Sequence, residues 1–338
     1  MQFLKILIIP VLLSVNVLAK AQDGDVKYTP SDNKNLAVVW TYEENNDKEF
    51  FKFVKEDLKE LGFFVNDPHH NVQAVYAQQF GETFLDNIAF DSLVNDKDVR
   101  PLLNIDPRIG GFNPFNLLTY RKKADGPTTV AHITPEAALD ILEISDPKVR
   151  EPFIKMFAPL DAAIDKKLGG KKTYLPLSGR AKDTMLNFEI PFEEPEDIDD
   201  FMDEFQEKFE STFEQNGYII AGFYNVKESF NTDEDVMPAY VSFWAYDLCH
   251  IEFSYNVFDG KNGVPMAGIF APCSMYVYIK EGENKIVIGM PSLRAWSGAL
   301  GMTDPKKLDI IDKLDIEITE IIVGFGGKVM PNGNPLKH

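Results

Sequence analysis

The sequence predicts an α+β fold made of two tandem copies of one two-layer unit, each a mainly antiparallel sheet with helices packed on one face. Hairpin strands and long helices follow one another out of strict alternation, which is typical of this class. The same order of elements also occurs twice along the chain. Because a self-complementary surface can pair with its own copy inside one chain, we expect the two units to form a pseudo-two-fold pair. Such a pseudo-dimer within one chain can exist as a monomer in solution.

The composition is that of a globular protein with two cores. The chain has 338 residues, of which 44% are hydrophobic and 26% are charged, and this length suits two domains of about 150 residues each. The net charge is −19 at pH 7. Since clustered Lys and Arg are needed to bind a phosphate backbone, this charge excludes nucleic acid as a partner. Two cysteines are too few for a zinc ribbon or a disulfide-dense scaffold.

The first 21 residues have the pattern of a secretory signal peptide. A basic residue, Lys5, precedes an apolar run over residues 6–18, and the small-x-small sequence Ala19-Lys20-Ala21 follows it. An apolar run of about 13 residues is shorter than the roughly 20 residues that a membrane-spanning helix needs. We therefore expect cleavage near Ala21, no membrane span in the remaining chain, and a periplasmic or secreted protein.

The first unit is predicted over residues 22–168. It opens with a strand at 36–41 and continues into a helix from Asp47, whose apolar residues recur at helical spacing. Gly62 ends this helix, as a left-handed C-terminal cap would. The later elements are a strand led by Pro114, a turn, a second strand, a short helix, and a long helix that starts at Asp146-Pro147.

The second unit is predicted over residues 186–326 and repeats this order. A strand at 187–192 precedes a helix whose phenylalanines recur every four residues, at Phe201, Phe205, Phe209 and Phe213. A strand led by Pro272, a turn, a second strand and a long helix from Asp304-Pro305 follow. Gly and Pro in residues 169–185 predict a linker between the units, and residues 327–338 are predicted to be a C-terminal tail.

Short motifs in the second unit resemble the DUF302 family, a domain of unknown function. Residues 271–273 read Ala-Pro-Cys and lead the strand Tyr-Val-Tyr at 276–278, which is similar to the family's Pro-Cys strand entry. The stretch after Cys249 is similar to the strand before the family's Cys-Asn-Pro. There the sequence departs from the pattern, because Tyr255 and Val257 occupy the Cys and Pro positions.

The first unit resembles the same family at residues 106–111, which start with Asp-Pro, and at residues 113–115, which read Asn-Pro-Phe. Phe115 stands where the family has the cysteine of its Pro-Cys pair. The resemblance covers nearly the whole chain after the signal peptide, as a tandem pair. It implies a compact α+β fold and dimeric association, and it implies no established reaction.

Cys249 and Cys273 are the two thiols of the chain, and both lie in the second unit. Three roles stay open for them. They can be buried inert thiols, or they can form a disulfide in an oxidising compartment. They can also carry redox or ligand chemistry, although the sequence has no Cys-x-x-Cys pair and no neighbouring basic cluster that would lower a thiol pKa.

His69 and His70 are weak candidates for a metal site. They lie in the sequence Asn-Asp-Pro-His-His-Asn at 66–71, which has the composition of a turn. Adjacent histidines can capture a transition metal if a third ligand comes from elsewhere. An exposed turn before a helix is the simpler interpretation, and we expect no cofactor.

The sequence contains no recognisable catalytic motif. We therefore expect a non-catalytic exported module that binds a small molecule or a protein partner in the groove between the units. The many aromatic residues, among them 26 Phe and 12 Tyr, suit an apolar pocket as well as a core. The alternative is a thiol-based redox or ligand-handling protein that uses Cys273 with Cys249.

Overall fold

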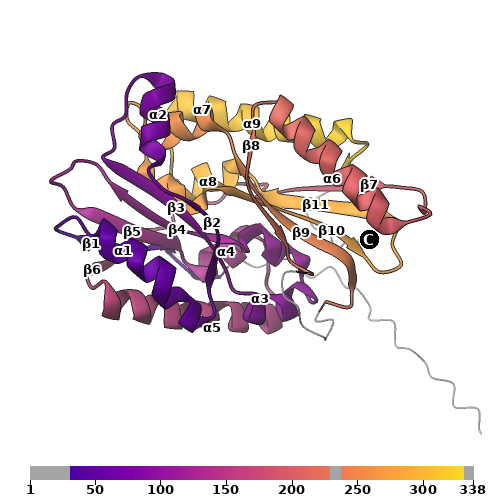
Figure 1. The fold of residues 1–338 in the computed structure, drawn as a ribbon, viewed down its shortest axis with the longest axis horizontal. Coiled ribbons are helices and arrows are strands. Elements are labelled where there is room, and N and C mark those ends of the chain that lie inside the picture. Colours follow the sequence, from indigo (N-terminus) through magenta and orange to yellow (C-terminus); the bar gives the residue numbers. More distant parts are fainter. Residues whose placement is uncertain (1–30, 229–236, 331–338) are drawn as a thin grey trace, which may run out of the picture.

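The computed structural model describes residues 31–228 and 237–330. It confirms the predicted fold class, because it contains two six-stranded antiparallel sheets, each with its own helices (Figure 1). The predicted signal peptide at 1–21 and the end of the predicted tail, at 331–338, lie outside the described residues. In the part of the chain that is described, no helix combines the length and the apolar character that crossing a bilayer demands.

The first unit holds the sheet with strand order β2-β3-β4-β5-β1-β6. Its strands are β1 (Asn35–Tyr42), β2 (Phe64–His69), β3 (Asn87–Val94), β4 (Phe115–Arg121), β5 (Thr128–Ile133) and β6 (Lys171–Pro176). Its helices are α1 (Asp47–Lys52), α2 (Val72–Phe80), α3 (Asp96–Leu103), α4 (Pro135–Ile141) and α5 (Pro147–Lys167), with shorter helical turns η1 (Phe53–Asp57), η2 (Leu58–Leu61) and η3 (Pro107–Phe112). As predicted, the helical run from Asp47 ends at Gly62, whose φ is 83°.

The second unit holds the sheet with strand order β12-β7-β11-β10-β9-β8. Its strands are β7 (Met185–Pro191), β8 (Ile219–Asn225), β9 (Tyr240–Cys249), β10 (Cys273–Lys280), β11 (Lys285–Pro291) and β12 (Lys328–Val329). Its helices are α6 (Ile198–Gln215), α7 (Ile251–Ser254), α8 (Leu293–Leu300) and α9 (Pro305–Gly324), with shorter helical turns η4 (Tyr255–Asp259) and η5 (Pro265–Phe270). Read from β8, the order is β8-β9-β10-β11-β7-β12, which corresponds strand for strand to β2-β3-β4-β5-β1-β6 of the first sheet. The two units therefore share one topology.

The predicted linker and the predicted tail each contain a strand, which corrects both assignments. After α5, β6 pairs with β1, and after α9, β12 pairs with β7. The signal for both is a Gly-Gly-Lys sequence, at 169–171 and at 326–328, which follows each long helix. Glycines there adopt positive φ, 71° at Gly169 and 89° at Gly326, and turn the chain back to the sheet. Each unit is therefore longer than its sequence pattern indicated.

Both faces of the second sheet are buried, and alternate residues of β10 show this. Met275 and Val277 pack in one cluster with the phenylalanines of α6 and the isoleucines of α9. Tyr276 and Tyr278 point the other way and belong to the larger cluster that both units share. The helices α6 and α9 thus cover one face, and Figure 1 shows α1 and α5 on the opposite side of the molecule. The first unit covers the second face.

The two units are joined by a reciprocal exchange of η3 and η5, which we call the exchanged loops. η3 of the first unit packs on β10 and β11 of the second sheet, and η5 packs on β4 and β5 of the first. Each loop makes its closest approach at a glycine. A Cβ atom at Gly110 would lie 2.7 Å from the Tyr276 Cβ, and one at Gly268 would lie 2.8 Å from the Leu118 Cδ1. A side chain at Gly110 would press on the Cβ of Tyr276, and one at Gly268 would have to displace the buried side chains of Leu118 and Phe90.

Replacing either of these glycines should therefore loosen the junction of the units. We expect Gly110→Ala and Gly268→Ala each to lower the free energy of unfolding by about 1–3 kcal/mol, because an added methyl overpacks the contact. Urea unfolding monitored by circular dichroism measures this. Gly324→Ala is the matched control, since its Cβ meets nothing within 4 Å, and it should change stability by about 1 kcal/mol or less. Equal stability of all three variants would contradict the exchange.

Candidate functional site

A cavity of about 230 Å³ lies between the two units. Its walls come from β2, α2 and β3 of the first unit and from β8, β9, α7, η4, β10 and α8 of the second. Figure 1 shows α2 beside α7, where the two units meet. Two lining residues are strongly exposed, Val75 at 43% and Ile219 at 46%, so the cavity opens to solvent between α2 and the start of β8. We call it the inter-unit cavity.

The lining of the inter-unit cavity is almost wholly apolar. Of its lining residues in the described part of the chain, none is Asp, Glu, Lys or Arg. The polar side chains in the wall are His69, His250, Tyr76 and Ser254, together with the two thiols. An isolated charge taken into such a place loses its hydration without gaining a partner, so the cavity disfavours ions.

Both predicted cysteine candidates line this cavity. Cys249 ends β9 and Cys273 begins β10, two neighbouring strands that pair in an antiparallel register. The two thiols are free. Burial raises the pKa of the Cys249 thiol to about 11 and raises the pKa of Cys273 well above its ordinary value. Both are therefore protonated at neutral pH, the opposite of what a reactive thiolate requires.

Cys273 has a much larger counterpart in the first unit. In the second sheet Cys273 pairs with Leu248, and in the first sheet Phe115 occupies the same register opposite Leu93. The Phe115 ring is buried and packs on Phe157, with 4.6 Å between ring centroids. The first unit thus has a buried ring at the register position where the second unit has a small thiol that lines the cavity.

The two adjacent histidines have separate partners. His69 is a strand residue at the end of β2, which corrects the predicted turn, and its Nε2 donates to the Ala221 carbonyl oxygen at 2.9 Å. Pro68 is tolerated in β2 because β2 is an edge strand, and its pairing with β3 shifts register between Val65 and Pro68. His70 Nε2 instead lies 2.8 Å from the buried Asp91 Oδ1.

His69 lines the inter-unit cavity and His70 does not. Within residues 31–228 and 237–330 there is no group of three or more His, Cys, Asp or Glu side chains arranged to hold a metal ion. Metal binding by His69 and His70 stays a prediction, and their separate hydrogen-bond partners do not support it.

Helix α2 is the part of the site that the sequence reasoning missed. Its Val72, Val75 and Tyr76 line the cavity. The helix is held against the second unit by Phe80, which stacks on Tyr255 at 4.2 Å. Just beyond it, the Thr83 hydroxyl and the Phe84 amide both donate to Asp259, each at 2.6 Å. A helix after residues 66–71 was expected, and α2 forms there, but nothing in the sequence places it against the other unit.

A buried polar group lies on the pseudo-two-fold axis beside the cavity; we call Ser92, Asn116, Asp247 and Ser274 the axial cluster. By strand register, Ser92 and Asp247 occupy equivalent places, as do Asn116 and Ser274. Asn116 Nδ2 donates to the Gly268 carbonyl of the other unit, and Ser274 Oγ lies 3.0 Å from the carbonyl of Pro114. The cluster therefore binds a backbone carbonyl of η5 and one that lies just after η3.

Asp247 is the titratable member of the axial cluster. Burial raises its pKa to about 7; the Ser92 and Ser274 hydroxyls oppose this rise, and Asp67 adds to it. Its Oδ1 lies 2.9 Å from Ser274 Oγ. Because a hydroxyl has one hydrogen to donate, Ser274 can hydrogen-bond both the Pro114 carbonyl and Asp247 only if a protonated Asp247 donates to Ser274. The geometry and the raised pKa thus agree on a carboxyl that is mainly neutral below pH 7.

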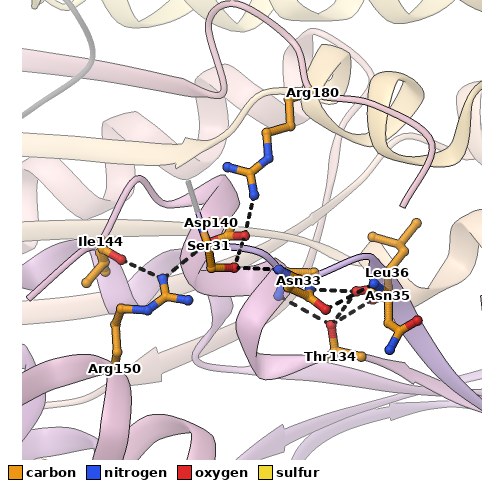
Figure 2. Close-up of polar contacts among 10 residues, drawn as sticks. Ser31, Asn33, Asn35, Leu36, Thr134, Asp140, Ile144, Arg150 and Arg180 are labelled. Carbon is orange, nitrogen blue, oxygen red and sulfur yellow. Dashed lines mark hydrogen bonds and ion pairs between the residues drawn. The ribbon is translucent and has the colours of Figure 1, made fainter. Parts of the chain in front are cut away.

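Another buried carboxylate, Asp140 of α4, binds residues from three other segments of the chain (Figure 2). It accepts hydrogen bonds from the Ser31 hydroxyl at 2.7 Å, from Arg150 of α5 at 3.1 Å, and from Arg180 in the segment between the units. Figure 2 shows the two guanidinium groups reaching Asp140 from different elements. With its charge matched by arginines, this group stabilises the fold and lies apart from the cavity.

The titration of Asp247 gives a pH dependence with a definite sign. Its folded-state pKa is raised from 3.8 to about 7, so its contribution to stability is full below pH 3.8 and is lost as pH rises toward 7. Replacing it by Asn should remove this loss, on the order of a few kcal/mol. Urea unfolding at several pH values measures the difference between the wild type and Asp247→Asn. Parallel profiles for the two proteins would show that Asp247 is not the buried acid described.

Comparisons with known proteins add one structural likeness. No family model matches the chain, and no curated protein matches it. Among solved structures, it is similar to an uncharacterized conserved DUF302 protein from Bacillus stearothermophilus. The two share 19% sequence identity, and the match covers 42% of this chain and 98% of that one, with a TM-score of 0.32.

Proposed function

We propose that this protein is a binding module that takes a small, uncharged, apolar molecule into the inter-unit cavity. The observation that carries the proposal is the cavity itself, about 230 Å³ in volume and without a charged side chain in its described lining. A dry apolar cavity of about 150 Å³ is known to bind benzene. The larger volume here fits a molecule of roughly ten carbon atoms.

The surroundings of the cavity support an uncharged ligand. The protein has a net charge of −19, and the Asp67 carboxylate lies 3.6 Å from the Nε2 atom of His69, which lines the cavity. An anion is therefore repelled before it arrives, and a cation finds no carboxylate in the wall. The exposed side chains at the mouth, Val75 and Ile219, favour an apolar molecule that enters between α2 and β8.

The alternative function, thiol chemistry at Cys273 with Cys249, has one observation in its favour: both thiols line the same cavity. The raised pKa of each thiol argues against it, because a protonated thiol is a poor nucleophile. We infer that the cysteines instead act as small apolar side chains that leave room for the ligand.

We also propose that the two units are DUF302-like domains and that the protein is exported. The first proposal is supported by the motifs at 106–115 and 271–278, which lie at η3, at the start of β4 and along β10. The second rests on the pattern of residues 1–21.

Filling the cavity should weaken binding. We expect Cys273→Phe, which gives the second unit the residue of the first, to weaken binding of the neutral ten-carbon fluorophore 1-naphthylamine by about tenfold or more, because the ring occupies the ligand's volume. The emission of this dye, which shifts to shorter wavelength in an apolar site, measures this on the mature protein. Val323→Phe is the control, because it adds a ring on the exposed side of α9, away from the cavity, and it should bind as the wild type does.

A second pair of variants tests the mouth without changing the core. Ile219→Asp places a charge at the mouth, whereas Ile316→Asp places one on the exposed side of α9, where Ile316 is 54% exposed. The first variant should weaken dye binding, and the second should not. If the wild type gives no saturable dye signal, the proposed function is wrong.

The state of the N-terminus and of the thiols can be read from one intact-mass measurement on protein recovered from its export compartment. We expect a chain that has lost about its first 21 residues and that carries two reduced thiols. Iodoacetamide at pH 7.5 should label the two thiols at least tenfold more slowly in the folded protein than in urea, since few of the buried thiols are ionised. A retained leader would overturn export, and rapid labelling of Cys273 in the folded protein would restore the thiol alternative.

A further inference from the structure

One wall of the inter-unit cavity is a continuous row of aromatic rings, Phe90, Phe258, Phe253 and Trp296, which we call the aromatic wall. Neighbouring ring centroids lie 5.7, 6.1 and 6.3 Å apart in that order. All four residues line the cavity, and all four are buried. The row crosses the junction of the units, because Phe90 belongs to β3 of the first unit and the other three belong to the second.

The aromatic wall is held firmly in place. The Trp296 ring stacks on Phe270 of an exchanged loop, with 5.1 Å between centroids and 13° between planes. Gly268 of the same loop approaches Phe90, because a Cβ there would lie 2.8 Å from Phe90 Cε1. The contact that joins the units thus also fixes both ends of the wall. A fixed surface of ring edges and faces selects among ligands by geometry as well as by size.

Apart from His69, Tyr76, His250 and Ser254, the rest of the lining is aliphatic or sulfur-bearing. Cys249 and Cys273 lie on paired strands, and Val72, Val75 and Ile219 lie toward the mouth. A polarisable sulfur makes favourable contacts with an aromatic ring. A flat aromatic molecule therefore finds ring partners in the aromatic wall and sulfur partners among the thiols, whereas a saturated molecule gains only from burial.

From this arrangement we propose that the ligand of the inter-unit cavity is a neutral, planar aromatic molecule of up to two fused rings. The inference rests on the proposed function and specifies the class of molecule it binds. The ring count follows from the volume, about 230 Å³ against the roughly 150 Å³ that accommodates one benzene. The absence of charge follows from the lining described above.

The test compares two molecules with the same ten-carbon skeleton, naphthalene and its saturated, non-planar counterpart decalin. Each is titrated against the mature full-length protein loaded with 1-naphthylamine, and the return of the dye's emission to its wavelength in water reports displacement. We expect naphthalene to displace the dye at a concentration about tenfold lower than decalin does. Equal or better displacement by decalin would overturn the aromatic class and would leave the proposed binding function standing.

A variant pair locates the preference in the aromatic wall. Phe253→Leu removes one ring of the wall while keeping an apolar side chain, and Phe213→Leu makes the same change in the separate core under α6. The ratio of naphthalene to decalin affinities should fall several-fold in the first variant and should not change in the second. An unchanged ratio in Phe253→Leu contradicts the role of the wall. If neither the dye nor either hydrocarbon binds the wild type, the proposed function itself fails.

Discussion

The reciprocal exchange of η3 and η5 is the contact on which the rest of the structure depends. Each loop leaves its own unit and packs on the sheet of the other, with Gly110 and Gly268 at the points of closest approach. This covers the inner face of both sheets, so neither unit buries its apolar residues alone. It also brings α2 of the first unit against η4 of the second. The inter-unit cavity exists because of this junction.

Much of the fold could be predicted from the sequence, because it depends on local patterns. The apolar spacing in 201–213 and the Asp-Pro starts at 146–147 and 304–305 specify helices by short-range physics, and α6, α5 and α9 form there. Strands β6 and β12 were missed because a short edge strand has little pattern of its own and is defined by the neighbour it pairs with. The repeated Gly-Gly-Lys was the signal available for both.

Three of the candidates from the sequence, Cys249, Cys273 and His69, line the candidate site, but most of its lining and its form were not predicted. The asymmetry between Phe115 and Cys273 is visible in the sequence, and of the two residues Cys273 lines the cavity. That His69 and His70 would face different partners, and that Phe90 would complete a wall with Phe253, depends on contacts between residues far apart in the chain. Such contacts follow from the docking of the units, which no short motif encodes.

The central claim is that a flat aromatic molecule occupies the space between the aromatic wall and the two thiols. A crystal structure of the mature protein soaked with 1-bromonaphthalene tests it most directly, because the bromine can be located by its anomalous scattering. The account predicts a bromine peak inside the inter-unit cavity, with the ring system between Phe253 and Cys273. A cavity that holds only ordered water in crystals grown under saturating 1-bromonaphthalene would contradict it.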